Sequence, residues 1–206
     1  MEGEFLLGKS SPITITVTPA TKNTTLTLTA SKTSAPVPAT ITFTATLVDS
    51  DGKPVVGRSV DFYVGTSVSW TGTTDSNGKT SVDLGFGKVG TYNVYAYFAG
   101  DSSYNSSTSS TIPISITKAP TSLTLVASRS TITAGESVDL IATLINSARN
   151  IPVVGATIKF YTSGGTYVGS AVTDSNGQAK TTLTIGVAGS YSYYASFDGD
   201  ENLEGC

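Results

Sequence analysis

The chain repeats itself at a spacing of 99 residues. The stretch TDSNG at Thr74–Gly78 returns at Thr173–Gly177. The longer stretch GTYNVYAYFAGD, which begins at Gly90, is matched at the same spacing by GSYSYYASFDGD, which begins at Gly189. A repeat of this length is the size of a whole small domain. The 206 residues therefore contain two homologous units in tandem, here called unit one and unit two.

Apolar and polar residues alternate along short segments of both units, which is the pattern of half-buried β-strands. In unit one the alternating apolar positions are Leu26, Leu28 and Ala30; Ile41, Phe43, Ala45 and Leu47; Val60, Phe62 and Val64; Val82, Leu84 and Phe86; and Tyr92, Val94, Ala96 and Phe98. The Asn-Gly pairs of the two TDSNG stretches accept positive φ and predict tight turns. The sequence therefore predicts an all-β fold of two tandem antiparallel β-sandwiches. The predicted cores include Phe43, Phe62, Phe98, Leu140, Phe160 and Phe197.

The order of these segments resembles a known family. The succession PVVGRSVDFYV, TDSNGKTSVDL and VGTYNVYAYFAGD is similar to the Ig-like repeats of bacterial and archaeal surface proteins, including intimin- and invasin-type adhesins. The Gly-x-Tyr at Gly90–Tyr92 and at Gly189–Tyr191 resembles the start of the penultimate strand, where a tyrosine corner is common. The resemblance implies Ig-like sandwiches that act as spacers, stalks or adhesive surfaces at the cell surface or outside the cell, without a shared catalytic site.

A further strand pattern, SSPITITVT at 10–18, precedes unit one. Its apolar positions lie 99 residues before those of TIPISIT, the last strand expected in unit one. The matched pairs are Ile13 with Ile112, Ile15 with Ile114, and Val17 with Ile116. The sequence of unit two reaches Cys206, before the counterpart of this strand. We therefore expect an N-terminal extension at 1–23 with a donor strand (10–18) and a linker, a complete Ig-like domain at 24–117, and a second at 118–206 that lacks its own last strand.

A sandwich without its last strand exposes unpaired backbone groups and a gap in its core. In unit two we expect this acceptor groove along Tyr191, Tyr193, Ala195 and Phe197. Its occupation by the Ile13–Val17 strand of another copy resembles donor-strand complementation in chaperone–usher pili and archaeal surface filaments. The arrangement predicts a structural subunit of an extracellular filament or pilus that polymerises head to tail, for adhesion or cell–cell contact.

Two other functions remain open from the sequence. The chain is also interpretable as a fragment of a longer tandem Ig-like stalk or adhesin, in which it acts as a spacer. A carbohydrate-binding module is the third hypothesis, because the outward-facing Tyr95, Tyr97 and Tyr194 could stack on sugars; cross-strand packing is the simpler interpretation of these rings. The expected partners are other copies of the chain, and the surfaces or glycans of host or neighbouring cells.

Composition excludes several other classes of protein. Only 13% of the residues are charged and the formal net charge is −3, so the basic face of a nucleic-acid-binding protein is missing. No apolar run approaches the roughly 20 residues of a membrane span, so we expect no membrane insertion. Histidine is absent, which excludes nucleophiles that histidine activates.

GFGKVG at Gly85–Gly90 has dinucleotide-loop spacing, but a strand pattern follows it instead of the helix that would hold pyrophosphate. We expect no enzyme activity and no cofactor.

Two smaller features concern ions and modification. Asp198, Asp200 and Glu201 form a carboxylate cluster that is a candidate for Ca²⁺ binding, and a solvated turn is the simpler interpretation because unit one lacks two of the three carboxylates. Asn-x-Ser/Thr sequons at Asn23 and Asn105 are candidate N-glycosylation sites of an exported glycoprotein.

Overall fold

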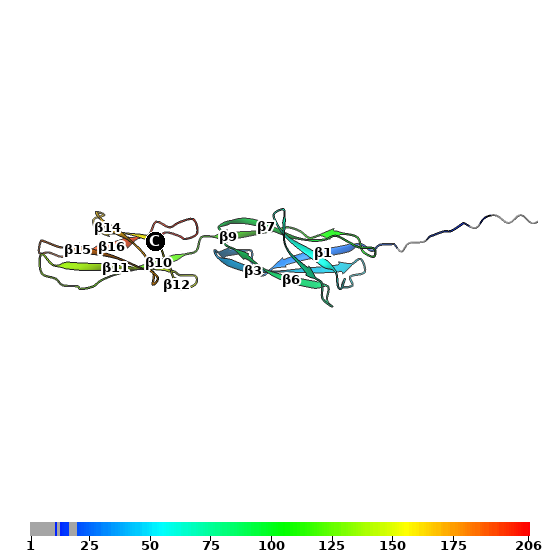
Figure 1. The fold of residues 1–206 in the computed structure, drawn as a ribbon, viewed down its shortest axis with the longest axis horizontal. Coiled ribbons are helices and arrows are strands. Elements are labelled where there is room, and N and C mark those ends of the chain that lie inside the picture. Colours follow the sequence, from blue (N-terminus) through cyan, green and yellow to red (C-terminus); the bar gives the residue numbers. More distant parts are fainter. Residues whose placement is uncertain (1–10, 12, 17–19) are drawn as a thin grey trace, which may run out of the picture.

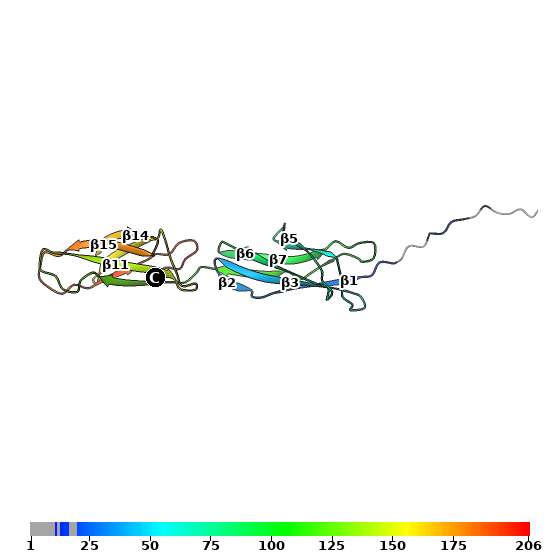
Figure 2. The same ribbon diagram turned by 60° about the horizontal axis from the view of Figure 1, so that its bottom comes forward.

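The computed structural model describes residues 11, 13–16 and 20–206, and within them every regular element is a β-strand. The strands form two sandwiches that stand end to end (Figure 1, Figure 2). This part of the chain contains no helix, and hence no helix long and apolar enough to cross a membrane. The all-β fold of two sandwiches, predicted from the alternating pattern, is confirmed.

Unit one consists of two sheets. One has the order β1-β3-β6, with β1 at Thr24–Ala30, β3 at Ala39–Asp49 and β6 at Lys79–Phe86. The other has the order β2-β9-β7-β4-β5, with β2 at Ser34–Pro36, β9 at Ile112–Thr117, β7 at Gly90–Phe98, β4 at Ser59–Val64 and β5 at Ser67–Thr73. The short β8, at Ser107–Thr108, also pairs with β7. All of these pairs are antiparallel except β2 with β9, which run parallel.

Unit two repeats most of this plan. One sheet contains β10 at Thr121–Ala127, β11 at Ser137–Asn146, β12 at Ile151–Pro152 and β15 at Gln178–Thr184, with β11 between β10 and β15. The other has the order β14-β13-β16, with β14 at Tyr167–Val172, β13 at Thr157–Thr162 and β16 at Tyr193–Ser196. Among the described residues of unit two, no strand occupies the places that β2 and β9 have in unit one.

Each unit has its own hydrophobic core between its two sheets. The six core side chains predicted from the alternating pattern are all buried, and none is more than 6% exposed; they are Phe43, Phe62, Phe98, Leu140, Phe160 and Phe197. Burial of one such side chain contributes roughly 1.5–3 kcal/mol to folding. The predicted core is therefore confirmed in both units.

The two TDSNG stretches form the tight turns that the sequence predicts. In unit one, Oδ1 of Asp75 accepts hydrogen bonds from the backbone N–H groups of Asn77 (2.8 Å) and Lys79 (2.9 Å). Gly78 closes the turn with a φ of 71°. A Cβ added at Gly78 would lie 2.4 Å from the carbonyl oxygen of Leu47, so a side chain does not fit there.

We expect Gly78→Ala to destabilise unit one by more than backbone strain alone. Positive φ costs an L-residue roughly 1–2 kcal/mol, and the contact with Leu47 adds about 1–3 kcal/mol of overpacking. Gly65→Ala is the matched control, because Gly65 has a φ of 63° and a Cβ there meets nothing within 4 Å. Trp70 is the single tryptophan and lies in β5, so its fluorescence in a urea titration reports unit one. Equal losses in the two variants would contradict the steric argument.

Candidate functional site

The last strand of unit one, β9, is enclosed by two neighbours. It pairs antiparallel with β7 over Gly90–Val94 and parallel with β2. Backbone hydrogen bonds of 2.9 Å flank the parallel pair at both ends. Between these ladders, Ile114 and Ile116 are 0% and 2% exposed. At this edge of the sandwich, β9 therefore satisfies the backbone of its neighbours and completes the core.

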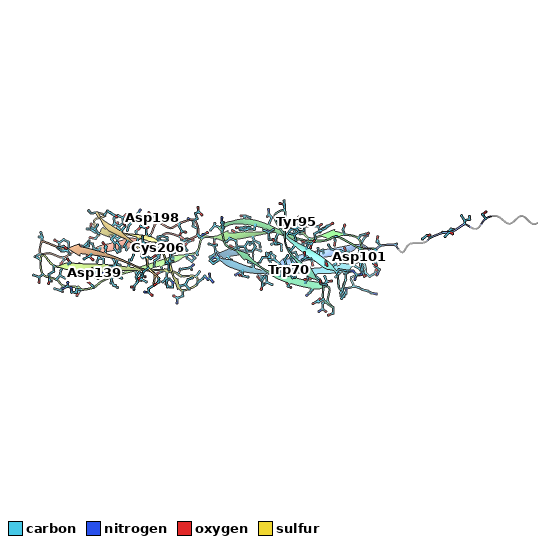
Figure 3. All side chains as sticks on the ribbon, in the orientation of Figure 1. Trp70, Tyr95, Asp101, Asp139, Asp198 and Cys206 are labelled. Atoms are coloured by element: carbon cyan, nitrogen blue, oxygen red, sulfur yellow. The ribbon has the colours of Figure 1, made fainter. Side chains whose placement is uncertain are left out.

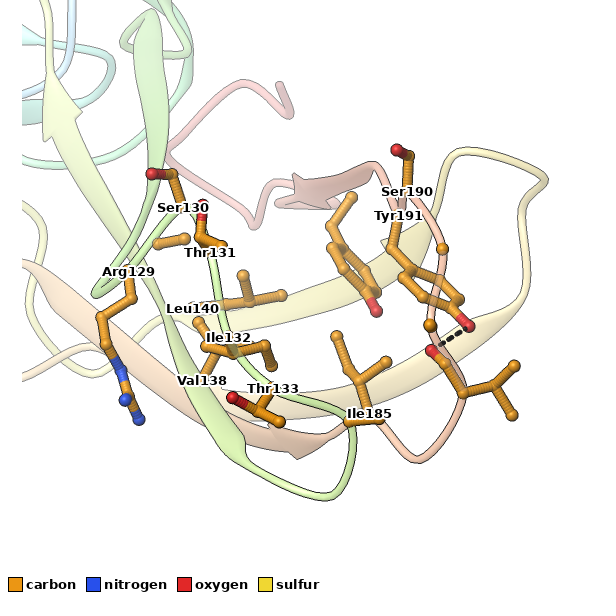
Figure 4. A pocket seen from close by; sticks show the side chains of 16 residues that line it. Arg129, Ser130, Thr131, Ile132, Thr133, Val138, Leu140, Ile185, Ser190 and Tyr191 are labelled. Carbon is orange, nitrogen blue, oxygen red and sulfur yellow. Dashed lines mark hydrogen bonds between the residues drawn. The ribbon is translucent and has the colours of Figure 1, made fainter.

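At the matching place in unit two there is an open groove with a volume of about 620 Å³ (Figure 4). One wall is the segment 130–134, the counterpart of the β2 region at a spacing of 97 residues. The other wall is the segment 187–191, which leads into β16. Val138, Leu140 and Ile185 form the floor between the walls. The groove therefore lies where unit one has its last strand.

Both walls of the groove lack the strand structure of their counterparts in unit one. β7 begins at Gly90, whereas β16 begins only at Tyr193, so the residues 189–192 that match the β9-paired part of β7 form no strand. The segment 131–133, which matches β2, also forms no strand. Within the described part of the chain, neither Ile132 nor Ala134 has a hydrogen-bonded backbone partner. The groove thus offers two unpaired backbone edges to an extended segment.

Tyr191 holds the second wall in shape. Its hydroxyl donates a hydrogen bond to the carbonyl oxygen of Val187 at 3.0 Å (Figure 4). Its counterpart Tyr92 donates to the carbonyl oxygen of Lys88 at the same distance. The tyrosine corner expected from Gly-x-Tyr is confirmed in both units. The corner is thus formed in unit two although residues 189–192 form no strand there.

The four residues that the sequence assigns to the acceptor groove have different positions. Tyr191 and Tyr193 line the groove, and Ala195 and Phe197 do not. Phe197 is buried in the core, and its backbone exchanges two hydrogen bonds with Cys206, at 2.8 and 2.9 Å. Ala195 corresponds to Ala96 of unit one, whose backbone bonds Ser109. The groove therefore lies beside the first half of the penultimate strand.

The wall 130–134 was missing from the predicted site. A three-residue strand such as β2 is too short for an alternating pattern to show. The signal that could have located this wall is the constant 97-residue spacing from Ala30–Phe43 to Ala127–Leu140. Matching hydrogen bonds support this alignment, because the N–H of Ser31 donates to Thr42 and the N–H of Ser128 donates to Asp139.

The N-terminal apolar segment does not pack on its own chain where the structure describes it. Ile13 and Ile15 are 90% and 82% exposed. Residues 13–16 belong to no strand, although the sequence predicts one, because a strand needs a neighbour to pair with. Val17, the third predicted donor residue, lies outside the described residues, as does Ser10. Two large apolar side chains are thus available for contacts with another molecule.

Two of the three tyrosines proposed for sugar stacking pack on a neighbouring tyrosine of their own sheet. Tyr95 stacks on Tyr63 with ring centroids 4.8 Å apart, and Tyr194 stacks on Tyr161 with centroids 5.2 Å apart. Tyr97 lies opposite Asp61 across β7 and β4. Desolvation at this face raises the pKa of Tyr63. Cross-strand packing, the simpler interpretation, therefore accounts for the stacked pairs.

The candidate calcium cluster is not assembled. Asp198, labelled in Figure 3, forms an ion pair with Lys159 and thereby raises the pKa of that lysine. Oδ1 of Asp200 accepts hydrogen bonds from the N–H groups of Asn202 and Leu203, both at 2.7 Å, and so caps a turn. In the residues that the structure describes, no group of three or more acidic, histidine or cysteine side chains is arranged to hold a metal ion.

The two sequons meet in space. Nδ2 of Asn105 donates a hydrogen bond to Oδ1 of Asn23 at 2.7 Å, and both side chains are exposed. Glycosylation at either asparagine stays a prediction.

The dinucleotide-like stretch Gly85–Gly90 runs from the last residues of β6 to the first residue of β7, so a strand follows it instead of a helix.

Lys22 fastens the connection between the N-terminal segment and unit one. Its Nζ lies 3.0 Å from Oδ2 of Asp49 and 2.6 Å from Oδ2 of Asp51. Its backbone N–H donates to the carbonyl oxygen of Ser103 at 2.9 Å. Asp49 is only 5% exposed, and the N–H of Lys53 together with the Lys22 ammonium holds the pKa of its carboxyl below the ordinary value.

This lowered pKa predicts a pH dependence of stability. A carboxyl with a lowered folded-state pKa stabilises the fold above its ordinary pKa of about 3.9, and this stabilisation is lost as the pH falls through the folded-state value. We therefore expect Asp49→Asn to lower the thermal midpoint of unit one at neutral pH. The difference from the unsubstituted chain should shrink as the pH falls below about 4, and it should vanish only once the pH is below the folded-state pKa. Trp70 fluorescence during heating measures both midpoints. Parallel curves from pH 7 to pH 2 would contradict this role of Asp49.

The fold is similar to that of several solved structures. Among solved structures, invasin, described as a bacterial integrin-binding protein, is 21% identical with a TM-score of 0.57 over 88% of this chain and 38% of that one. The D0–D1 domain of intimin is 26% identical (TM-score 0.36; 86% of this chain, 93% of that one). The Yersinia pseudotuberculosis adhesin InvE is 19% identical (TM-score 0.45; 87% and 56%). The chain thus spans little more than half of the InvE chain and less than half of the invasin chain.

No curated protein matches the sequence significantly. The likeness to invasin agrees with the fold of the two sandwiches. The bacterial Ig-like domain (group 3) family matches the sequence twice, at residues 28–117 in unit one and at 124–205 in unit two. Two matches that together cover most of the sequence show that this chain belongs to the bacterial Ig-like domain (group 3) family.

Proposed function

We propose that this chain is a structural subunit of an extracellular filament, in which the Ile13–Val17 strand of one copy fills the groove of unit two in the next copy. The observation that carries the proposal is the open groove, which lies at the position of β9 and has two unpaired edges. The exposed segment at the other end of the chain has the apolar spacing of β9. Each molecule thus has one donor and one acceptor.

The chemistry of the donor fits the groove. The segment supplies β-branched side chains on one face and threonines on the other, as a strand at the rim of a sandwich requires. Burial of each aliphatic side chain would contribute roughly 1.5–3 kcal/mol. Each added ladder hydrogen bond would contribute about 0.5–1.5 kcal/mol. Addition of a strand also satisfies the two edges that would otherwise promote aggregation.

The path of β9 indicates how the copies would be arranged. β9 leaves unit one and continues into unit two. A donor strand in the groove would leave unit two in the same direction and continue into unit one of the donating copy. The acceptor and the donor therefore use different surfaces, which produces an open chain of units in a row instead of a closed ring.

The likeness of the fold to invasin supports a place outside the cell. Invasin is described as a bacterial integrin-binding protein. A filament of this kind at a bacterial surface would contact host or neighbouring cells. This role needs no catalytic group, and the sequence contains no histidine.

A second candidate is a spacer in a longer row of Ig-like units. It is favoured by the short connection between β9 and β10 and by the end-to-end order of the sandwiches (Figure 1). In that arrangement the Ile13–Val17 strand completes a preceding sandwich of the same chain. The two candidates use the same strand chemistry and differ in whether separate copies associate.

We expect Ile15→Asp to abolish polymers, because a lone carboxylate would have to enter an apolar groove. The matched control is Thr16→Asp, whose side chain points to the opposite face of the strand. Ile15 is 82% exposed in the single chain, so its replacement leaves both sandwiches folded. Light scattering over a range of concentrations and negative-stain electron microscopy give the measurement.

Deletion of residues 1–18 is a second variant with the same expected loss, since unit one keeps all of its strands. Filaments formed by Ile15→Asp would overturn the proposal. An unsubstituted chain that stays monomeric at every concentration would also overturn it, in favour of the spacer.

A further inference from the structure

The groove of unit two is not an exact copy of the surroundings of β9. In unit one, Ala35 of β2 is the parallel partner of Ile116. At a spacing of 97 residues, its counterpart is Ile132, which is larger by three carbons. Figure 4 shows the Ile132 side chain in the groove, next to Leu140. The wall is therefore thicker at this position than in unit one.

The space between wall and strand is closed at this position in unit one. Ala35 is 6% exposed and Ile116 is 2% exposed, so the two side chains share a buried site. A larger wall residue leaves less room for the strand residue opposite it, because protein interiors are close-packed. The floor of the groove differs in the opposite direction, since Leu140 and Ile185 stand where unit one has larger phenylalanines.

The N-terminal segment has a smaller residue at the matching position. Ile116 of β9 corresponds to Val17, which is one methylene smaller, whereas Ile112 and Ile114 correspond to isoleucines. The wall is thus larger and the strand residue smaller at the same position. Among the three matched apolar positions of the strand, only position 17 has a smaller side chain than its counterpart in β9, and it is the position that faces the larger wall residue. This points to selection of the strand by the groove.

We infer that Ile132 is a specificity-determining residue, through which the groove of unit two prefers a strand with valine at position 17 over a strand with isoleucine there. The inference rests on the proposed pairing of the N-terminal strand with this groove. Its consequence is that unit two takes the N-terminal segment of another copy in preference to a segment with the sequence of β9. A size mismatch at one closed position is enough for this, since one extra methylene in a packed site is unfavourable.

The test uses the full chain with Ile15→Asp as acceptor, so that its own donor segment does not compete. Two synthetic peptides are titrated into it, one with the sequence of residues 10–18 and one with Val17→Ile, and binding is followed by calorimetry. We expect the valine peptide to bind about tenfold more tightly than the isoleucine peptide. In an acceptor that also carries Ile132→Ala, we expect the preference to disappear or reverse. Ile132→Val, which removes a single methylene, should give an intermediate preference.

The outcomes separate this inference from the proposed function. If both peptides bind equally well to both acceptors, and an Ile15→Asp peptide does not bind, the groove accepts strands but Ile132 does not select them; this overturns the inference alone. If no peptide binds, the groove is not a strand acceptor, and both the inference and the proposed function are overturned. A preference for valine that persists with Ile132→Ala also overturns the inference.

Discussion

The backbone of a β-strand needs a partner along each edge that is not exposed to water, and the structure of both units depends on this requirement. In unit one, β9 supplies the partner for β7 and for β2, and both are regular strands. In unit two no described strand lies in that place, and the chain on both sides is irregular. The penultimate strand is accordingly nine residues long in unit one and four in unit two.

The features that the units share lie mostly away from this edge. Both have the Asp-Ser-Asn-Gly turn capped by the aspartate side chain. In both, the glycine lies so close to a backbone carbonyl of β3 or β11 that a side chain does not fit. Both have a buried phenylalanine at the matching place, Phe62 in β4 and Phe160 in β13, and both have a tyrosine corner. Away from the groove, the scaffold of unit two is therefore formed as it is in unit one. In the proposed assembly, this formed scaffold would lower the cost of binding, because only the two walls would have to be ordered.

The sequence predicted the fold well where a strand is long enough to show its period. Along the eleven residues of β3, every second side chain is buried and those between are exposed or half-buried. The strand and its core residues Ile41 and Phe43 could therefore be assigned from the pattern alone. The three residues of β2 carry no period, and the wall formed by their counterparts was missed. The sequence also assigned Ala195 and Phe197 to the groove. In unit one, β9 pairs only with the first part of β7, and Ala195 and Phe197 correspond to later positions, so both lie beyond the groove. The register of β9 against β7 depends on tertiary packing, which an alternating pattern does not show.

The strand that completes unit one is also the strand through which the chain leaves it. Only Lys118–Pro120 separate the end of β9 from β10, and Ala119 among them already bonds to unit two. A pull on the two ends of the chain therefore acts lengthwise on β9. Its ladders with β2 and β7 lie parallel to that pull, so their hydrogen bonds are loaded together in shear instead of being opened one after another. In a row of such sandwiches, the position of the last strand is where mechanical tension passes from one unit to the next.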